Sequence, residues 1–114
     1  MDTGTDRPYH GLVDAPNDFE WDDAKASANE AKHGISFETA ASVFDDLDRV
    51  VFEDGRRAYG EMRFAAIGVT AKGVLFVAFT MRGEAVRIIS ARPANRKERR
   101  RYSDAGGKAD GNRT

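Results

Sequence analysis

The residues with the clearest chemistry lie in the stretch 80–102, TMRGEAVRIISARPANRKERRRY. Its second half contains one acid, Glu98, among six cationic side chains. The cations are Arg92, Arg96, Lys97, Arg99, Arg100 and Arg101. A planar guanidinium can bind two oxygens of one phosphate, so this run suits a polyanionic ligand. A solvated helix face that keeps a protein soluble would carry the same charges, and the run alone does not separate the two interpretations.

Two elements must position these cations. Val86, Ile88 and Ile89 predict a strand over 85–91, and Pro93 is expected near the first position of a helix that runs to about residue 102. The preceding residues predict further strands at 49–53, 62–70 and 74–81, and Asp54-Gly55 is expected to begin a turn. The strand at 74–81 is apolar on both faces, which is typical of a central strand that is covered on each side.

The N-terminal half predicts two helices. Asp22 is a suitable N-cap for a helix over 23–33, and Gly34 suits its left-handed end. The packing face of this helix is expected to consist of Ala24, Ala28 and Ala31. Ser36 begins a second helix, which ends at Asp45-Asp46 and carries Phe37, Ala40, Ala41 and Phe44 at helical spacing. Phe19-Glu20-Trp21 reads as a short strand or as an apolar lead-in to the first helix.

These elements predict an α+β fold with two N-terminal helices, a four-stranded antiparallel β-meander and a C-terminal basic helix. The 114 residues are enough for one domain, which we expect over 19–103, between a flexible leader at 1–18 and a flexible tail at 104–114. Cysteine is absent, so disulfides and thiolate metal sites are excluded. No stretch is apolar enough to span a bilayer, and we expect a cytoplasmic protein.

The net charge of −1 conceals two halves of opposite sign. Residues 14–54 contain twelve acids and three bases, whereas residues 55–101 contain three acids and twelve bases. The basic half could attract RNA, DNA or an acidic protein. The acidic half could contact a basic partner or could be a solvated surface.

Three stretches of the chain resemble the BrnT family of type II toxin–antitoxin toxins. They are FEWDDAKASANEAKHGISFETAASVFDD at 19–46, YGEMRFAAIG at 59–68, and the basic stretch at 80–102. The combination of AKHGISF with RIISARPAN is specific. The resemblance implies a fold related to the RelE-like ribonucleases and an endoribonuclease that blocks translation. It also implies neutralisation by a ribbon–helix–helix antitoxin called BrnA, with DNA bound only through the toxin–antitoxin complex.

Cleavage of RNA without a metal requires that the 2′-hydroxyl is deprotonated, the pentavalent phosphate is stabilised and the 5′-oxygen is protonated. Candidates for stabilising the phosphate are the arginines on strands or at strand ends, Arg63, Arg82, Arg87 and Arg92. Strand alternation places Arg63 on the face of Ala65 and Ile67, and Arg87 on the face of Ala85, Ile89 and Ala91. Arg63 or Arg87 could instead form structural ion pairs with Glu53, Glu61 or Glu84.

Candidates for proton transfer are His33, Glu61 and Tyr102. Histidine is the side chain whose ordinary pKa suits acid–base chemistry at neutral pH, but beside Gly34 His33 could simply complement the helix C-terminus. Tyr102 could act on RNA, as C-terminal tyrosines of RelE-like relatives often do, or could pack the last helix onto the sheet. Trp21 and Phe19 are assigned to the core or to an antitoxin-facing surface.

The remaining candidates contact RNA rather than react with it. We expect phosphate contacts from Lys32, Arg92, Arg96, Arg99 and Arg100. No metal is expected, because Asp45, Asp46 and Asp48 are explained by capping and solvation. No nucleotide motif is present, so no cofactor is expected. Two functions stay open: a metal-independent ribonuclease toxin, and a non-catalytic subunit whose basic helix grips nucleic acid or an acidic protein.

Overall fold

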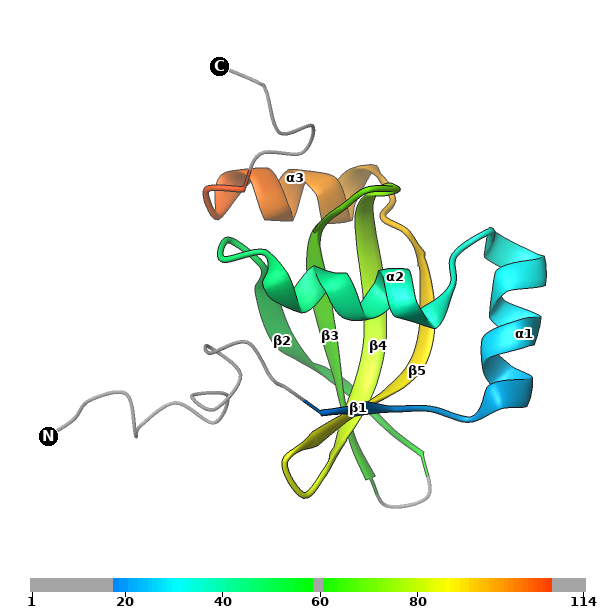
Figure 1. The fold of residues 1–114 in the computed structure, drawn as a ribbon. Coiled ribbons are helices and arrows are strands. Elements are labelled where there is room, and N and C mark those ends of the chain that lie inside the picture. The colour runs from blue at the N-terminus through cyan, green and yellow to red at the C-terminus, as the bar shows by residue number, and fades with distance from the viewer. Residues whose placement is uncertain (1–17, 59–60, 108–114) are drawn as a thin grey trace, which may run out of the picture.

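The computed structural model describes residues 18–58 and 61–107 (Figure 1). The predicted leader, apart from Asp18, and residues 108–114 of the predicted tail lie outside this part of the chain. The strands are β1 (Phe19–Glu20), β2 (Val50–Ala58), β3 (Glu61–Thr70), β4 (Gly73–Arg82) and β5 (Ala85–Pro93). The helices are α1 (Asp23–His33), α2 (Phe37–Ala41), the 3-10 helix η3 (Ser42–Asp45) and α3 (Arg96–Asp104). None of the described helices is long and apolar enough to cross a membrane.

The sheet has the strand order β1-β5-β4-β3-β2. Strands β2 to β5 form the predicted antiparallel meander, with β4 in the middle. The predicted sheet lacked β1, which pairs parallel to β5 through Phe19 and Glu20 and makes the sheet five-stranded and mixed. A two-residue strand is too short for its periodicity to be recognised in the sequence, so β1 could not be predicted with certainty. Its pairing depends on contact with β5, which is distant in the chain. Strand β2 also continues through the expected turn, with a register shift between Glu53 and Arg57.

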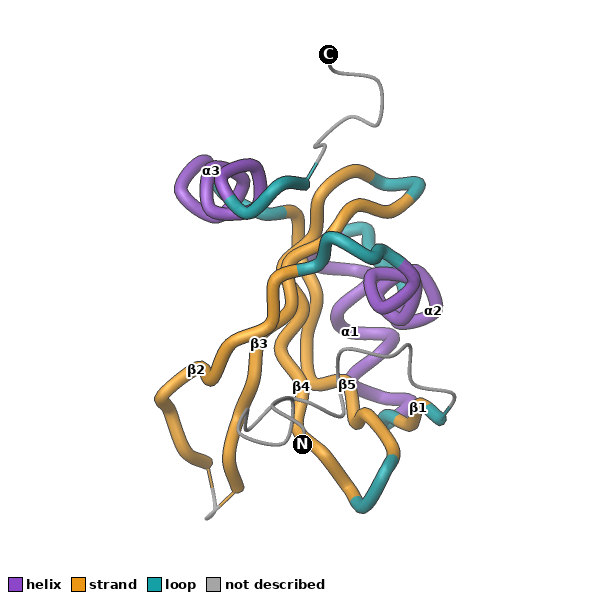
Figure 2. Tube along the Cα trace, turned by 90° about the vertical axis from the view of Figure 1, so that its left-hand side faces the viewer, coloured by secondary structure: helices purple, strands orange, loops and turns teal. Residues whose placement is uncertain are grey.

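Helices α1 and α2 lie on one side of the sheet and α3 on the other (Figure 2). The main core fills the side of α1 and α2, where Phe37, Phe44 and Phe79 are almost fully buried. Phe19 and Trp21 pack against this core, as one of the two interpretations expected. The second predicted helix changes from α to 3-10 geometry after Ala41.

Helix α1 begins and ends where predicted. The Asp22 side chain accepts from the Lys25 N–H at 3.0 Å, and Gly34 is left-handed with φ 74°. The predicted alanine face is wrong, because Ala24, Ala28 and Ala31 are all exposed. The buried residue of α1 is Asn29, whose amide donates to the Ala91 carbonyl at 2.9 Å and accepts from the Ala91 N–H at 3.1 Å. Asn29 thus replaces the missing strand partner at the edge of β5.

A β-bulge changes which β5 residues share a face. Ala78 pairs with Ser90 but Phe79 pairs with Ile88, so β5 contains one extra residue. Ala91 therefore lies in the core beneath α1 and α2 instead of on the face of Arg87, as strict alternation predicted. The same shift brings Arg92 onto the face of Arg87, because the extra residue reverses the alternation between them.

Helix α3 begins later than predicted. Pro93 is the last residue of β5, and Asn95 is the N-cap. The Asn95 side chain accepts from the Glu98 N–H at 2.8 Å, while Glu98 accepts from the Asn95 N–H at 2.9 Å. This reciprocal capping box satisfies two backbone N–H groups at the start of the helix and fixes that start at Asn95.

Candidate functional site

Four of the candidates for catalysis lie on the sheet face opposite α1 and α2, which we call the basic face. Thr80 of β4 pairs with Arg87 of β5, and the residue next to Arg63, Phe64, pairs with Phe79. The alternation along these strands brings Arg63, Arg82 and Arg87 onto the basic face. We call these three the arginine row. They share this face with Glu61, as an active site built on stiff strands requires.

Two members of the arginine row already bind a carboxylate. Arg82 pairs with Glu61 at 3.0 Å, and both side chains are more than one third exposed. Arg87 pairs at 3.0 Å with Glu20, which is not among the acids that the sequence predicts as its partners. Glu20 reaches Arg87 because β1 adds itself beside β5 in parallel register. Arg87 therefore forms a structural ion pair in this structure, although its partner is not one of the expected acids Glu53, Glu61 and Glu84.

Arg63 is different from its neighbours. It forms no ion pair with any residue that the structure describes, and its Nε is buried without a hydrogen-bond acceptor. A buried donor without a partner costs free energy, about 1–3 kcal/mol, and such a group calls for an explanation.

A groove of about 720 Å³ lies between α3 and the basic face. We call it the α3 groove. Its apolar floor consists of Phe52, Ile67 and Phe76. Four cations line it, namely Arg92, Lys97, Arg100 and Arg101, together with the acids Asp54, Glu98 and Asp104. Aromatic rings next to cations are the combination that single-stranded nucleic acids favour.

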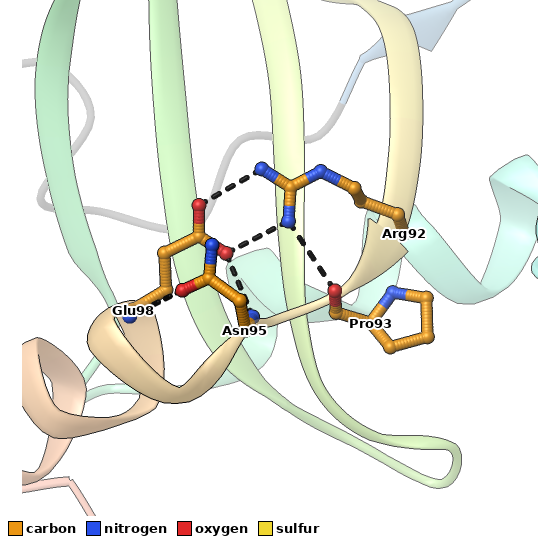
Figure 3. Close-up of polar contacts among 4 residues, drawn as sticks. All are labelled: Arg92, Pro93, Asn95 and Glu98. Carbon is orange, nitrogen blue, oxygen red and sulfur yellow. Dashed lines mark hydrogen bonds and ion pairs between the residues drawn. The ribbon is translucent and has the colours of Figure 1, made fainter.

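The Arg92 side chain is bound to Glu98 in the first turn of α3 (Figure 3). Its two terminal nitrogens donate to the two Glu98 oxygens, each at 2.8 Å. Burial alone would raise the pKa of Glu98, but the bonds from Arg92 and from the Asn95 N–H outweigh it and hold that pKa below its ordinary value. The bond to Glu98 in turn raises the pKa of Arg92. Arg92 thus ties β5 to the first turn of α3, a role that differs from the expected RNA contact.

Tyr102 lies in the core. Its side chain is 1% exposed, and its hydroxyl donates to Asp46 Oδ2 at 2.5 Å. The same oxygen accepts from the Val69 N–H at 2.9 Å, while Oδ1 accepts from the Asp48 N–H. Tyr102 therefore packs α3 onto the sheet, as the structural interpretation expected, and its hydroxyl is not accessible to a substrate in this conformation. Asp46 serves as a structural acceptor, in line with the capping interpretation.

His33 and Lys32 occupy the last turn of α1. That helix packs along β5 and the main core, on the other side of the sheet from α3 (Figure 2). The structure therefore does not bring these two residues to the arginine row. Both stand where a cation complements the negative end of the helix dipole.

The basic helix presents its cations in two directions. Of the three expected RNA contacts on this helix, Arg100 lines the α3 groove, whereas Arg96 and Arg99 are exposed and do not line it. The expectation missed Lys97 and Arg101, which lie with Arg100 and Asp104 at i, i+3, i+4 and i+7 spacing. That helical spacing was available in the sequence. Phe52 and Phe76 were also missed, because only the sheet register shows that they lie side by side.

Residues 21–98 match the family described as "Ribonuclease toxin, BrnT, of type II toxin-antitoxin system". This range contains the arginine row and ends within α3, before Arg100 and Arg101. No curated protein matches the chain. Because the match covers more than half of its length, the chain belongs to the BrnT family of ribonuclease toxins from type II toxin–antitoxin systems.

Proposed function

We propose that this chain is a metal-independent endoribonuclease that cleaves RNA by attack of a ribose 2′-hydroxyl on the adjacent phosphate and so inhibits translation. Membership of a ribonuclease toxin family supports the class of reaction. The observation that carries the proposal is that Arg63, in one row with Arg87, forms no ion pair with a residue of the described chain. Such a cation, held by a sheet, can stabilise a phosphate whose charge increases in the transition state.

The spacing of the strands supports a shared phosphate. Arg63 and Arg87 project from β3 and β5, with Thr80 of β4 between them. Neighbouring strands lie about 4.8 Å apart, so the two Cα atoms are separated by about 10 Å. Two arginine side chains can reach a common phosphate across that span. Arg63 would bind first, and Arg87 would exchange its bond to Glu20 for one to the phosphate.

Glu61 is our proposed general base. Its ion pair with Arg82 is exposed, and such pairs contribute little to stability and exchange readily. A phosphate that attracts Arg82 would free the Glu61 carboxylate to accept the proton of the 2′-hydroxyl. His33 and Tyr102 take no part in this proposal, because one lies beyond the other face of the sheet and the other is buried.

Membership of this family also implies a protein partner. As a type II toxin, the chain has an antitoxin partner, and we infer that this is a BrnA-like ribbon–helix–helix protein through which the complex contacts DNA. We further infer a RelE-like fold and action in the cytoplasm. These inferences rest on the resemblance of the three stretches described above.

The test uses purified protein and RNA in the presence of EDTA. We expect new RNA ends that carry a 5′-hydroxyl, because attack by the 2′-hydroxyl leaves that group on the downstream product. Arg63→Ala should lower kcat by about 100-fold or more, the usual cost of removing one donor to a developing charge. Arg96→Ala is the matched control, since Arg96 is exposed and does not line the groove.

Intact RNA with a mobility shift would contradict this proposal and favour the second function, a subunit that binds without breaking a bond. One observation favours that alternative. Arg82, Arg87 and Arg92 are each neutralised by a carboxylate of the same chain, as structural arginines often are. Full activity of Arg63→Ala in EDTA would likewise remove the phosphate role from Arg63.

A further inference from the structure

We propose that the α3 groove is a nucleobase subsite, in which one unstacked base of single-stranded RNA lies on the ring of Phe52 while its flanking phosphates meet Arg100 and Arg101. The inference rests on the proposed function to the extent that RNA is the ligand. It adds a substrate class, single strands, and a binding contact that is separate from the arginine row.

The floor of the groove is built for a flat apolar group. The Phe52 and Phe76 rings have centroids 6.3 Å apart and are tilted by 62°. Both side chains are only partly buried, whereas Ile67, which also lines the groove, is fully buried. Stacking of a base on an aromatic side chain contributes about 1–3 kcal/mol and tolerates any base.

Each ring already carries a planar cation. The Arg101 guanidinium carbon lies 3.8 Å from the centroid of Phe52, and that of Arg92 lies 4.3 Å from the centroid of Phe76. A guanidinium and a nucleobase are both flat and bind to the same ring face. The free protein thus fills with arginine the positions that a base can take.

The two arginines that lie over the rings differ in how many other contacts hold them. Arg92 is fixed by its two bonds to Glu98 and a third, at 3.3 Å, to the Pro93 carbonyl (Figure 3). Arg101 forms no ion pair with a residue of the described chain and is exposed on α3. Arg101 can therefore move from Phe52 to a phosphate when a base arrives, whereas Arg92 stays as a wall of the groove.

The charges of the groove favour a base over a bare phosphate at its floor. Asp54 and Asp104 line the groove together with the cations. Carboxylates repel a phosphate that enters deeply, but they can accept hydrogen bonds from the N–H groups of a base edge. A neutral base at the floor and phosphates at the rim avoid this repulsion and keep the phosphates beside the cations.

This arrangement selects single strands. In an A-form duplex the bases are paired and stacked on one another, so their faces cannot reach a protein ring. A loop or a single strand can turn one base outward at little cost. We therefore expect a preference for single-stranded RNA that duplex RNA of the same sequence does not share.

The first test measures wild-type binding by fluorescence anisotropy. The probes are a single-stranded 2′-O-methyl RNA of about eight nucleotides, its duplex, and an abasic oligonucleotide of the same length. We expect the single strand to bind about tenfold more tightly than either control. Equal affinity for the abasic backbone would overturn the subsite. The 2′-O-methyl group removes the attacking hydroxyl, so binding is measured whether or not the protein cleaves RNA, and the two proposals can fail separately.

The second test uses matched variants. Phe52→Leu keeps an apolar side chain, and we expect it to weaken binding of the single strand about tenfold without affecting the abasic probe. Arg101→Gln should weaken both probes, because it removes a phosphate contact, while Arg96→Gln should change neither, because Arg96 does not line the groove. A Phe52→Leu protein that folds, as judged by circular dichroism, and binds the single strand like the wild type would refute the stacking contact. If that variant does not fold, the comparison of the three probes with the wild-type protein still tests the subsite.

Discussion

At the scale of single residues, the partners of the arginines decide their roles. Arg82, Arg87 and Arg92 each meet a carboxylate, and Arg63 meets none in the described chain. The sequence shows four equivalent cations on strands. Only the register shows that Glu20 lies beside Arg87, since the two are 67 residues apart.

Tyr102 leads to a prediction about stability. Tyr102→Phe keeps the ring but removes the bond from its hydroxyl to Asp46. We expect the free energy of unfolding to fall by about 1–2 kcal/mol, as is usual for the loss of a buried hydrogen bond to a carboxylate. Urea denaturation at neutral pH measures the change.

Ser103→Ala is the control for this substitution, because Ser103 is exposed on the same helix. It should change the stability by less than about 0.5 kcal/mol. A Tyr102→Phe protein of unchanged stability that no longer cleaves RNA would contradict the packing role and return Tyr102 to the chemistry.

At the scale of elements, three separate contacts hold α3 on the sheet. They are the capping box of Asn95 and Glu98, the ion pair of Glu98 with Arg92, and the bond of Tyr102 to Asp46. Gly107 also lies against the Tyr102 ring, where an added Cβ would come within 2.3 Å of it. The helix that carries the groove cations is thus anchored at both ends, as a binding element should be.

The lowered pKa of Glu98 predicts how this anchor responds to acid. A carboxylate with a folded-state pKa below its ordinary value of 4.5 stabilises the fold above that pH, and the contribution is lost as the pH falls through the folded-state pKa. Glu98→Gln should therefore lower the free energy of unfolding by about 1–2 kcal/mol at pH 7 and by clearly less near pH 3. Urea denaturation of both proteins at the two pH values measures this; an equal difference at both would show that the charge of Glu98 is not responsible.

The ends of helices were predicted correctly where the capping residues lie next to them in the sequence. The caps Asp22, Gly34 and Ser36 act through residues within one turn, so they can be read directly from the chain. The packing of α1 could not be predicted, because Asn29 is explained only by the open edge of β5. The bulge at Ile88–Ser90 lacks a local signal as well, and it moved Ala91 to the opposite face.

At the scale of the whole molecule, the two charged halves of the chain are only partly separated in space. The exposed acids Asp23, Glu30 and Glu38 lie on α1 and α2, away from the basic face. Glu20, by contrast, comes from the acidic half and joins the basic face through β1. The fold therefore neutralises part of the charge that the sequence concentrates in its second half.

This distribution predicts the salt dependence of RNA binding. Lys97, Arg100 and Arg101 line the α3 groove without an ion pair in the described chain, so each can contact one phosphate. For single strands, log K should fall with log salt concentration by about 0.7 per contact, which gives a slope near −2 for the three cations. Titrations of the 2′-O-methyl strand at several salt concentrations measure it.

Lys97→Gln should reduce this slope by about 0.7, and Arg96→Gln should leave it nearly unchanged. An equal reduction by both substitutions would mean that binding follows the total charge of α3 rather than the contacts of the groove.

By itself, the sequence determined the α+β class, the caps of the N-terminal helices, the central position of β4 and the supply of arginines, because periodicity, capping and composition act over a few residues. It also carried the likeness to the toxin family that the match over residues 21–98 confirms. Only the tertiary structure decided which of the four strand arginines meets no carboxylate among the described residues, that Tyr102 is buried, and that Phe52 and Phe76 form a floor beneath Arg101. These facts depend on strand register and on one bulge, which bring together residues far apart in the chain and have no local signal.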